Sequence, residues 1–125
     1  MKATAMPKQE FIEDIKLSYA EAAQMAQTEL GSGFDCALVL GSGISSAMKG
    51  IEILGELPYS ALPGMPRSSV DGHANRLSAI NFGSKRVLVF SGRFHLYEGF
   101  SLKEILAQVV IASRMGIKNI IFTNA

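Results

Sequence analysis

The sequence predicts an α/β protein with a mixed, mostly parallel sheet flanked by helices. Two observations predict this class. Apolar residues recur at helical spacing in residues 7–30 and 101–115, and short continuous apolar runs at residues 36–40 and 117–123 are typical of strands buried on both faces. The chain has 125 residues, of which 48% are hydrophobic, so it can build the core of one domain.

Residues 7–30 are predicted to form one helix. Pro7 suits a first helical position because its missing N–H would be unpaired there anyway. Gly31 and Gly33 end the helix, since glycine adopts the left-handed cap conformation freely. We expect its apolar face to be buried in the core. The face consists of Phe11, Ile12, Ile15, Tyr19, Ala22, Ala26 and Leu30.

Two strands and a long loop are expected next. The run at 36–40 is bounded by glycines and predicts a buried strand, and a second strand is expected at 51–57. Prolines and a glycine then interrupt residues 58–73. A loop of this length in a compact domain is usually functional.

The second half predicts a hairpin, a helix and a strand. Residues 76–82 and 86–91 are expected to pair through a glycine turn. In the helix at 101–115, Ser101 and Glu104 have the spacing of a capping box, and Phe100 and Ile105 that of a hydrophobic staple. A buried strand at 117–123 follows.

The composition of the chain disfavours several classes of function and partner. Twelve basic and eleven acidic side chains leave a net charge of +1, which disfavours a domain that holds nucleic acid by its net field. No apolar run reaches the ~20 residues of a membrane helix, so no membrane partner is expected. Cys36 is the one cysteine and cannot form an internal disulfide, and the N-terminus lacks a secretion signal. These features fit a reducing compartment.

The centre of the chain is the predicted site for a small anion. Residues 60–95 carry five basic side chains and one acidic side chain. Arg93, His95 and Tyr97 follow a buried-type strand, and in an extended chain they would point to one side. A guanidinium, an imidazole and a phenol that face one pocket would suit a sugar phosphate.

Two further segments could contribute to this site. Gly41-Ser42-Gly43 follows a predicted strand, and its glycines would let the backbone approach a phosphate. It completes neither a dinucleotide fingerprint, nor a P-loop, nor a nucleophile elbow, which disfavours a Rossmann-type dinucleotide domain. His73 ends the proline-rich loop and could donate to an anion.

Four segments together resemble the trimeric type of purine nucleoside phosphorylase. They are G-S-G at 41–43, P-R-S-S-V-D-G-H-A at 66–74, G-R-F-H-L-Y-E-G at 92–99 and T-N-A at 123–125. Their order and spacing match the family. The segment G-R-F-H-L-Y-E-G favours this branch over methylthioadenosine phosphorylases. The resemblance makes residues 1–125 the N-terminal part of a single phosphorylase domain, with residues 1–6 expected to be disordered.

The resemblance implies roles residue by residue. Phosphate would be bound by Ser42, His73, Arg93 and the amide of Ala125. Tyr97 would contact the ribose, and His95 would lie near its 5′-hydroxyl, so that Arg93 and His95 are the expected catalytic residues. The implied reaction is phosphorolysis of purine ribonucleosides in purine salvage, by a homotrimer.

The resemblance also implies limits. The family's base-recognising residues lie beyond T-N-A, so this chain would hold no base-binding residue and would be inactive alone. No metal and no organic cofactor are implied, because inorganic phosphate is a co-substrate. The family often continues G-S-G-L-G-G, whereas Ser45 and Ser46 stand here, which restricts the loop. The alternative is a non-catalytic domain, a remnant of the family, that binds phosphate or a nucleoside.

Overall fold

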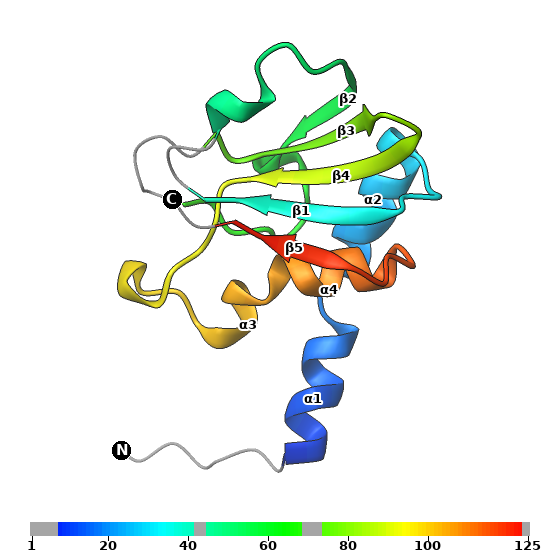
Figure 1. Ribbon diagram of the computed structural model, residues 1–125. Coiled ribbons are helices and arrows are strands. Elements are labelled where there is room, and N and C mark those ends of the chain that lie inside the picture. Colours follow the sequence, from blue (N-terminus) through cyan, green and yellow to red (C-terminus); the bar gives the residue numbers. More distant parts are fainter. Residues whose placement is uncertain (1–7, 42–44, 69–73, 124–125) are drawn as a thin grey trace.

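The computed structural model describes residues 8–41, 45–68 and 74–123. Five strands form one sheet in the order β2-β3-β4-β1-β5 (Figure 1). Their bounds are β1 Cys36–Leu40, β2 Ile53–Pro58, β3 Arg76–Phe82, β4 Lys85–Ser91 and β5 Ile120–Phe122. The predicted mixed sheet is confirmed. β4, β1 and β5 run parallel, whereas β2-β3 and β3-β4 are antiparallel pairs.

The helices are α1 Lys8–Leu17, α2 Ala20–Leu30, α3 Leu102–Ile105 and α4 Ala107–Arg114, and short 3-10 helices span Ser45–Met48, Tyr59–Ala61 and Leu96–Glu98. Two helices, α2 and α4, lie against one face of this sheet, whereas α1 extends away from it (Figure 1). α2 and α4 cover the main core, where Phe90, Leu77 and Ile111 are fully buried. No helix in the described ranges is long and apolar enough to cross a membrane.

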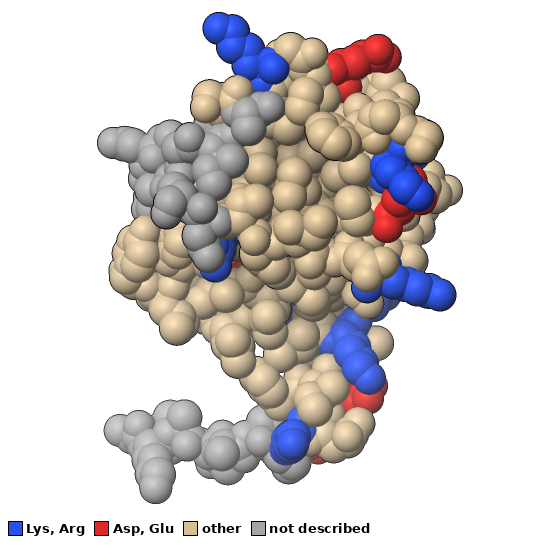
Figure 2. Space-filling model, viewed as in Figure 1, with Lys and Arg blue, Asp and Glu red and all other residues tan. Residues whose placement is uncertain are grey.

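The opposite face of the sheet is seen in Figure 2, where charged side chains lie around the rim and few lie over the strands. A smaller apolar cluster of Leu40, Ile80, Val87 and Val89 lies on this side. Met48 and Ile51 pack against that cluster and cover part of it. The two clusters explain why the central strands have nearly continuous apolar sequences.

The single helix predicted for residues 7–30 is wrong. Tyr19 has φ 60 and separates α1 from α2. A left-handed non-glycine residue costs about 1 kcal/mol. Two contacts offset this cost: the Tyr19 ring packs against the main core, and its hydroxyl donates to the Lys103 carbonyl at 3.2 Å.

The predicted burial of the whole apolar face is also wrong. α1 extends away from the sheet and has no buried residue, whereas α2 buries Ala22, Ala23, Ala26 and Leu30 (Figure 1). The predicted disordered start at 1–6 lies outside the described residues.

The helix predicted at 101–115 forms as two helices, because Leu106 with ψ 1 leaves the helical geometry between α3 and α4. The capping box is confirmed: Ser101 Oγ accepts from the Glu104 amide at 3.2 Å, and Glu104 accepts from the Ser101 amide at 3.0 Å. Phe100 and Ile105 both pack against the main core. The predicted strand at 117–123 is shorter and covers Ile120–Phe122.

Replacing Ser101 with alanine should lower the free energy of unfolding by about 1 kcal/mol, because the Glu104 amide loses its acceptor. Chemical denaturation measures this loss. Exposed Ser84, in the hairpin turn, provides a matched Ser→Ala control that should change stability by less than ~0.5 kcal/mol. Equal losses in the two variants would argue against the cap.

Candidate functional site

The carboxyl ends of three parallel strands meet at one edge of the sheet, which we call the ligand edge. Gly41 follows β1, Gly92 and Arg93 follow β4, and Thr123 follows β5. β3 runs the opposite way, so its first residue, Arg76, lies opposite Ser91 at the same edge. Ligands of open α/β sheets bind outside such strand ends.

Thr123 joins the ends of β1 and β5. Its hydroxyl donates to the Val39 carbonyl at 3.1 Å and accepts from the Gly41 amide at 3.1 Å. The Thr123 amide also donates to Val39, at 3.0 Å. These contacts fix Gly41, the residue that immediately precedes Ser42.

Arg93 lies half-buried at this edge and reaches toward β5. Its Nη1 donates to the Thr123 carbonyl at 3.3 Å, and its guanidinium carbon lies 5.6 Å from the centroid of the Phe122 ring. The Thr123 carbonyl thus orients the Arg93 guanidinium, a planar group with five N–H donors. Such a guanidinium is suited to bind an oxyanion through a bidentate pair of hydrogen bonds.

His95 and Tyr97 lie together after Arg93. Their rings stack with centroids 4.9 Å apart and an interplanar angle of 11°. The prediction of an extended chain through Arg93, His95 and Tyr97 is wrong, because residues Leu96–Glu98 form a 3-10 helix. The stacking therefore comes from the turn, and Arg93 is directed separately toward Thr123. Tyr97 is 76% exposed, so its ring could contact a ligand from solvent.

Glu98 connects this turn to the proline-rich loop. One carboxylate oxygen accepts from the His95 amide at 2.9 Å, and the other accepts from the Ser68 hydroxyl at 2.8 Å. Since Ser68 is buried, this contact ties the end of the described loop to the His95 turn.

Asn75 holds the other end of that loop. Its Oδ1 accepts from the Ser68 amide at 2.8 Å, and its Nδ2 donates to the Ser68 carbonyl at 3.0 Å. Asn75 has φ 52, a conformation that asparagine tolerates better than most residues. The pair holds together the two residues that flank segment 69–74. His73 belongs to this segment.

Three of the predicted phosphate ligands, Ser42, His73 and Ala125, lie outside the described residues. Their described chain neighbours are Gly41, Ala74 and, two residues before Ala125, Thr123. The structure thus places Arg93 at the ligand edge, next to Thr123, and His95 and Tyr97 at the turn that follows Arg93. The roles of all six residues stay predictions. In the described ranges, no cluster of three or more His, Cys, Asp or Glu side chains could hold a metal ion.

Sequence reasoning missed a buried cluster of three polar groups, formed by the Gly92 carbonyl, Tyr59 and Gln108. The Gly92 carbonyl accepts from the Tyr59 hydroxyl at 2.8 Å and from Gln108 Nε2 at 2.5 Å. Tyr59 and Gln108 are 0% and 1% exposed. Burial raises the pKa of Tyr59 and keeps its hydroxyl protonated as a donor. One signal in the sequence could have indicated this cluster: Gln108 stands among apolar residues of a helix that faces the core.

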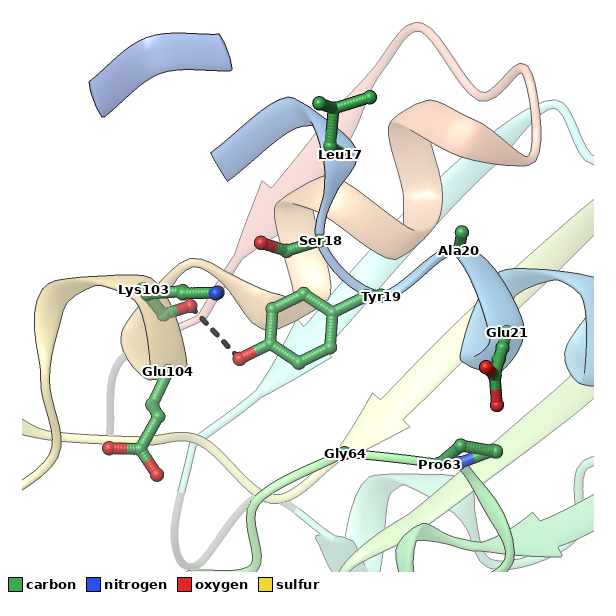
Figure 3. A pocket seen from close by; sticks show the side chains of 9 residues that line it. All are labelled: Leu17, Ser18, Tyr19, Ala20, Glu21, Pro63, Gly64, Lys103 and Glu104. Carbon is green, nitrogen blue, oxygen red and sulfur yellow. Dashed lines mark hydrogen bonds between the residues drawn. The ribbon is translucent and has the colours of Figure 1, made fainter. Parts of the chain in front are cut away.

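A separate cavity of about 530 Å³ lies at the junction of α1 and α2 (Figure 3). Of the candidate site residues that the structure describes, Arg93, His95 and Tyr97, none lines it. Tyr19 crosses it to reach Lys103, and burial together with the Glu104 carboxylate raises the pKa of Tyr19. Its lining residues are Leu17, Ser18, Tyr19, Ala20, Glu21, Pro63, Gly64, Lys103 and Glu104.

The predicted phosphate role of His73 implies that replacing Asn75 with alanine weakens the binding of inorganic phosphate several-fold, because the contacts between Ser68 and Asn75, the two residues that flank segment 69–74, are lost. Asn75→Gly separates this effect from backbone strain, since glycine accepts φ 52. Both variants should bind phosphate more weakly, and the alanine variant should also be less stable. Calorimetric titration and thermal unfolding measure the two effects. Unchanged phosphate affinity in both variants would contradict a role for the Ser68–Asn75 hydrogen bonds in phosphate binding.

The fold defines a class of α/β proteins with a mixed sheet and flanking helices, and comparison with known proteins narrows that class. No family model matches the chain. It is 35% identical over 105 residues to purine nucleoside phosphorylase 1 of Geobacillus stearothermophilus, covering 84% of this chain and 38% of that relative. Identity to the Mycobacterium tuberculosis purine nucleoside phosphorylase is 38% over 109 residues, covering 83% and 40%.

Solved structures give the same result. The purine nucleoside phosphorylase of Schistosoma mansoni in complex with acetate superposes with a TM-score of 0.74 at 28% identity, covering 91% of this chain and 40% of that chain. The resemblance to the purine nucleoside phosphorylase family is thereby confirmed, and it covers a partial, N-terminal portion of the family's chain. The chain spans about two-fifths of the length of the relatives it matches.

Proposed function

We propose that this chain supplies the phosphate- and ribose-binding half-site of an enzyme that cleaves purine ribonucleosides by phosphorolysis. The observation that carries the proposal is the position of Arg93, which lies half-buried at the carboxyl ends of parallel strands and precedes the stacked His95–Tyr97 pair in the chain. Similarity to purine nucleoside phosphorylases supports the substrate class. A solved neighbour is an isoform of the Schistosoma mansoni enzyme in complex with cytosine and ribose 1-phosphate.

In the proposed reaction, a phosphate oxygen forms a bond to the anomeric carbon of the ribose while the glycosidic bond to the purine nitrogen breaks. The purine takes the electron pair of that bond and a proton, and ribose 1-phosphate is the second product. The transition state has positive charge on the sugar, which a fixed phosphate dianion stabilises. Arg93 would hold the dianion, together with Ser42, His73 and the Ala125 amide. His95 and Tyr97 would bind the ribose.

The remaining components of this proposal come from outside the chain. The groups that hold the purine and protonate it would belong to polypeptide that residues 1–125 do not contain. We propose no metal and no organic cofactor, since phosphate itself is the nucleophile. A homotrimer in the cytoplasm is the proposed form of the whole enzyme.

A second candidate function is binding without turnover. It is favoured by one observation, that Arg93 at the ligand edge presents a guanidinium suited to an oxyanion, a group that binds without breaking a bond. A domain of this kind could bind phosphate or a nucleoside at the ligand edge and leave the glycosidic bond intact.

Intact mass and inosine cleavage, measured on the protein isolated from its source, separate the two functions. The phosphorolysis proposal predicts a mass well above 13.4 kDa and release of hypoxanthine that requires phosphate. A mass of 13.4 kDa, with phosphate binding and no release, would support the binding function instead. Inosine cleavage that is equally fast without phosphate would overturn phosphorolysis.

A further inference from the structure

Gln108 is buried in the core and makes hydrogen bonds that packing alone does not require. It lies on α4 between buried Ala107 and Val110 and is itself 1% exposed. Burying an amide in such surroundings is unfavourable unless it is hydrogen-bonded, and a leucine of similar size would fill the same volume without that cost. Gln108 Nε2 donates to the Gly92 carbonyl and to the Tyr59 hydroxyl.

The three groups form a closed set of hydrogen bonds. Tyr59 uses its single proton for the Gly92 carbonyl, at 2.8 Å, and its oxygen accepts from Gln108 at 3.3 Å. The Gly92 carbonyl therefore has two donors, one from α4 and one from the 3-10 helix Tyr59–Ala61. A carbonyl held from two independent elements has little freedom to rotate.

This carbonyl belongs to the peptide unit that leads into Arg93. The peptide is planar and trans, so the direction of the Gly92 carbonyl fixes the plane from which the Arg93 backbone continues. Gly92 has φ 135, and a glycine backbone is flexible. Contacts from other elements are therefore needed to fix the Gly92–Arg93 peptide in one orientation. At the far end of the side chain, the Thr123 carbonyl holds the guanidinium at 3.3 Å. Arg93 is thus held at its backbone and at its tip.

We propose that Gln108 and Tyr59 are positioning residues that set the affinity of the ligand edge for a phosphate oxyanion by fixing the peptide before Arg93. This inference rests on the proposed function and adds two residues to its phosphate half-site. Neither residue touches the anion in this account. Both act through the Gly92–Arg93 peptide, because each donates a hydrogen bond to the Gly92 carbonyl.

The test measures the dissociation constant of inorganic phosphate for the full chain and for Gln108→Leu, by calorimetric titration at a temperature where circular dichroism shows both to be folded. We expect about tenfold weaker binding, the effect of roughly one lost hydrogen bond. Tyr59→Phe keeps the ring in the core and should also weaken binding. It is the second variant if Gln108→Leu does not fold.

Two comparisons separate positioning from general destabilisation. Ile111→Val lies on the same helix, is fully buried and should lower the unfolding temperature without changing phosphate affinity. In an Arg93→Ala background, Gln108→Leu should produce no further loss of affinity, because the group through which it acts is gone.

The outcomes are distinct for the two proposals. If the unmodified chain does not bind phosphate, the proposed function fails. If the chain binds phosphate and both Gln108→Leu and Tyr59→Phe bind it equally well, the positioning role is overturned and the proposed function stands. An equal loss with and without Arg93 would also overturn it, because the effect would then not pass through Arg93.

Discussion

Arg93→Ala should weaken the binding of inorganic phosphate about 100-fold. Hydrogen bonds to charged groups contribute roughly 1.5–3 kcal/mol, and a bidentate pair to an oxyanion therefore corresponds to a factor of this size. Arg93→Lys keeps the charge and loses the planar pair of donors, so it should recover only part of the affinity. In a complete enzyme, the same change should raise the phosphate concentration needed for half-maximal rate.

Arg76→Ala is the matched control, since Arg76 is a second arginine at the ligand edge. Its Nε lies 2.7 Å from the Glu56 carboxylate, so its charge is already paired. Arg76→Ala changes the net charge of the chain by the same amount as Arg93→Ala. We expect it to change phosphate affinity less than threefold. A similar loss in both variants would mean that the edge attracts phosphate by its general charge and that Arg93 has no special position.

Gly92→Ala should destabilise the fold by about 3 kcal/mol and displace Arg93. Its φ of 135 lies in a region that only glycine occupies at low cost, and an added Cβ would lie 3.1–3.3 Å from the Oδ1, N and Cα atoms of Asn75. Two of these three atoms are backbone, so the contact cannot be relieved by a side-chain rotation. Denaturant unfolding measures the loss, and phosphate titration measures the displacement.

Gly99→Ala is the control for Gly92→Ala. Gly99 has φ 89, and an added Cβ there would meet nothing within 4 Å. It should cost about 1 kcal/mol from backbone conformation alone. If the two substitutions destabilise equally, the close approach of Gly92 to Asn75 has no energetic consequence, contrary to this account.

Local signals predicted the elements that depend on neighbouring residues. The Ser101–Glu104 capping box and the hairpin of β3 and β4 form as expected, because their contacts lie close together in the sequence. The alternation expected for Arg93, His95 and Tyr97 failed although the contact that breaks it is also local. It assumed an extended chain, whereas Glu98 accepts from the His95 amide and closes a turn.

Long-range contacts explain what sequence reasoning missed. The apolar periodicity runs through Tyr19 without interruption, and the break there depends on Lys103, 84 residues away. Gln108 and Tyr59 are 49 residues apart, and Gly92 joins them only after α4 has packed onto the sheet. A buried glutamine is visible in the sequence as an irregularity, but its partners are visible only in the fold.

The most direct test of the central claim is a titration of the isotope-labelled 125-residue chain with inorganic phosphate, followed by the NMR signals of individual backbone amides. The account predicts saturable shifts of Gly41, Arg93 and Thr123, the described residues at the ligand edge. Amides at the opposite end of the sheet, such as Lys85, should not move. Absence of saturable shifts at the ligand edge, or equal shifts at both ends of the sheet, would contradict the claim that this edge is a phosphate half-site.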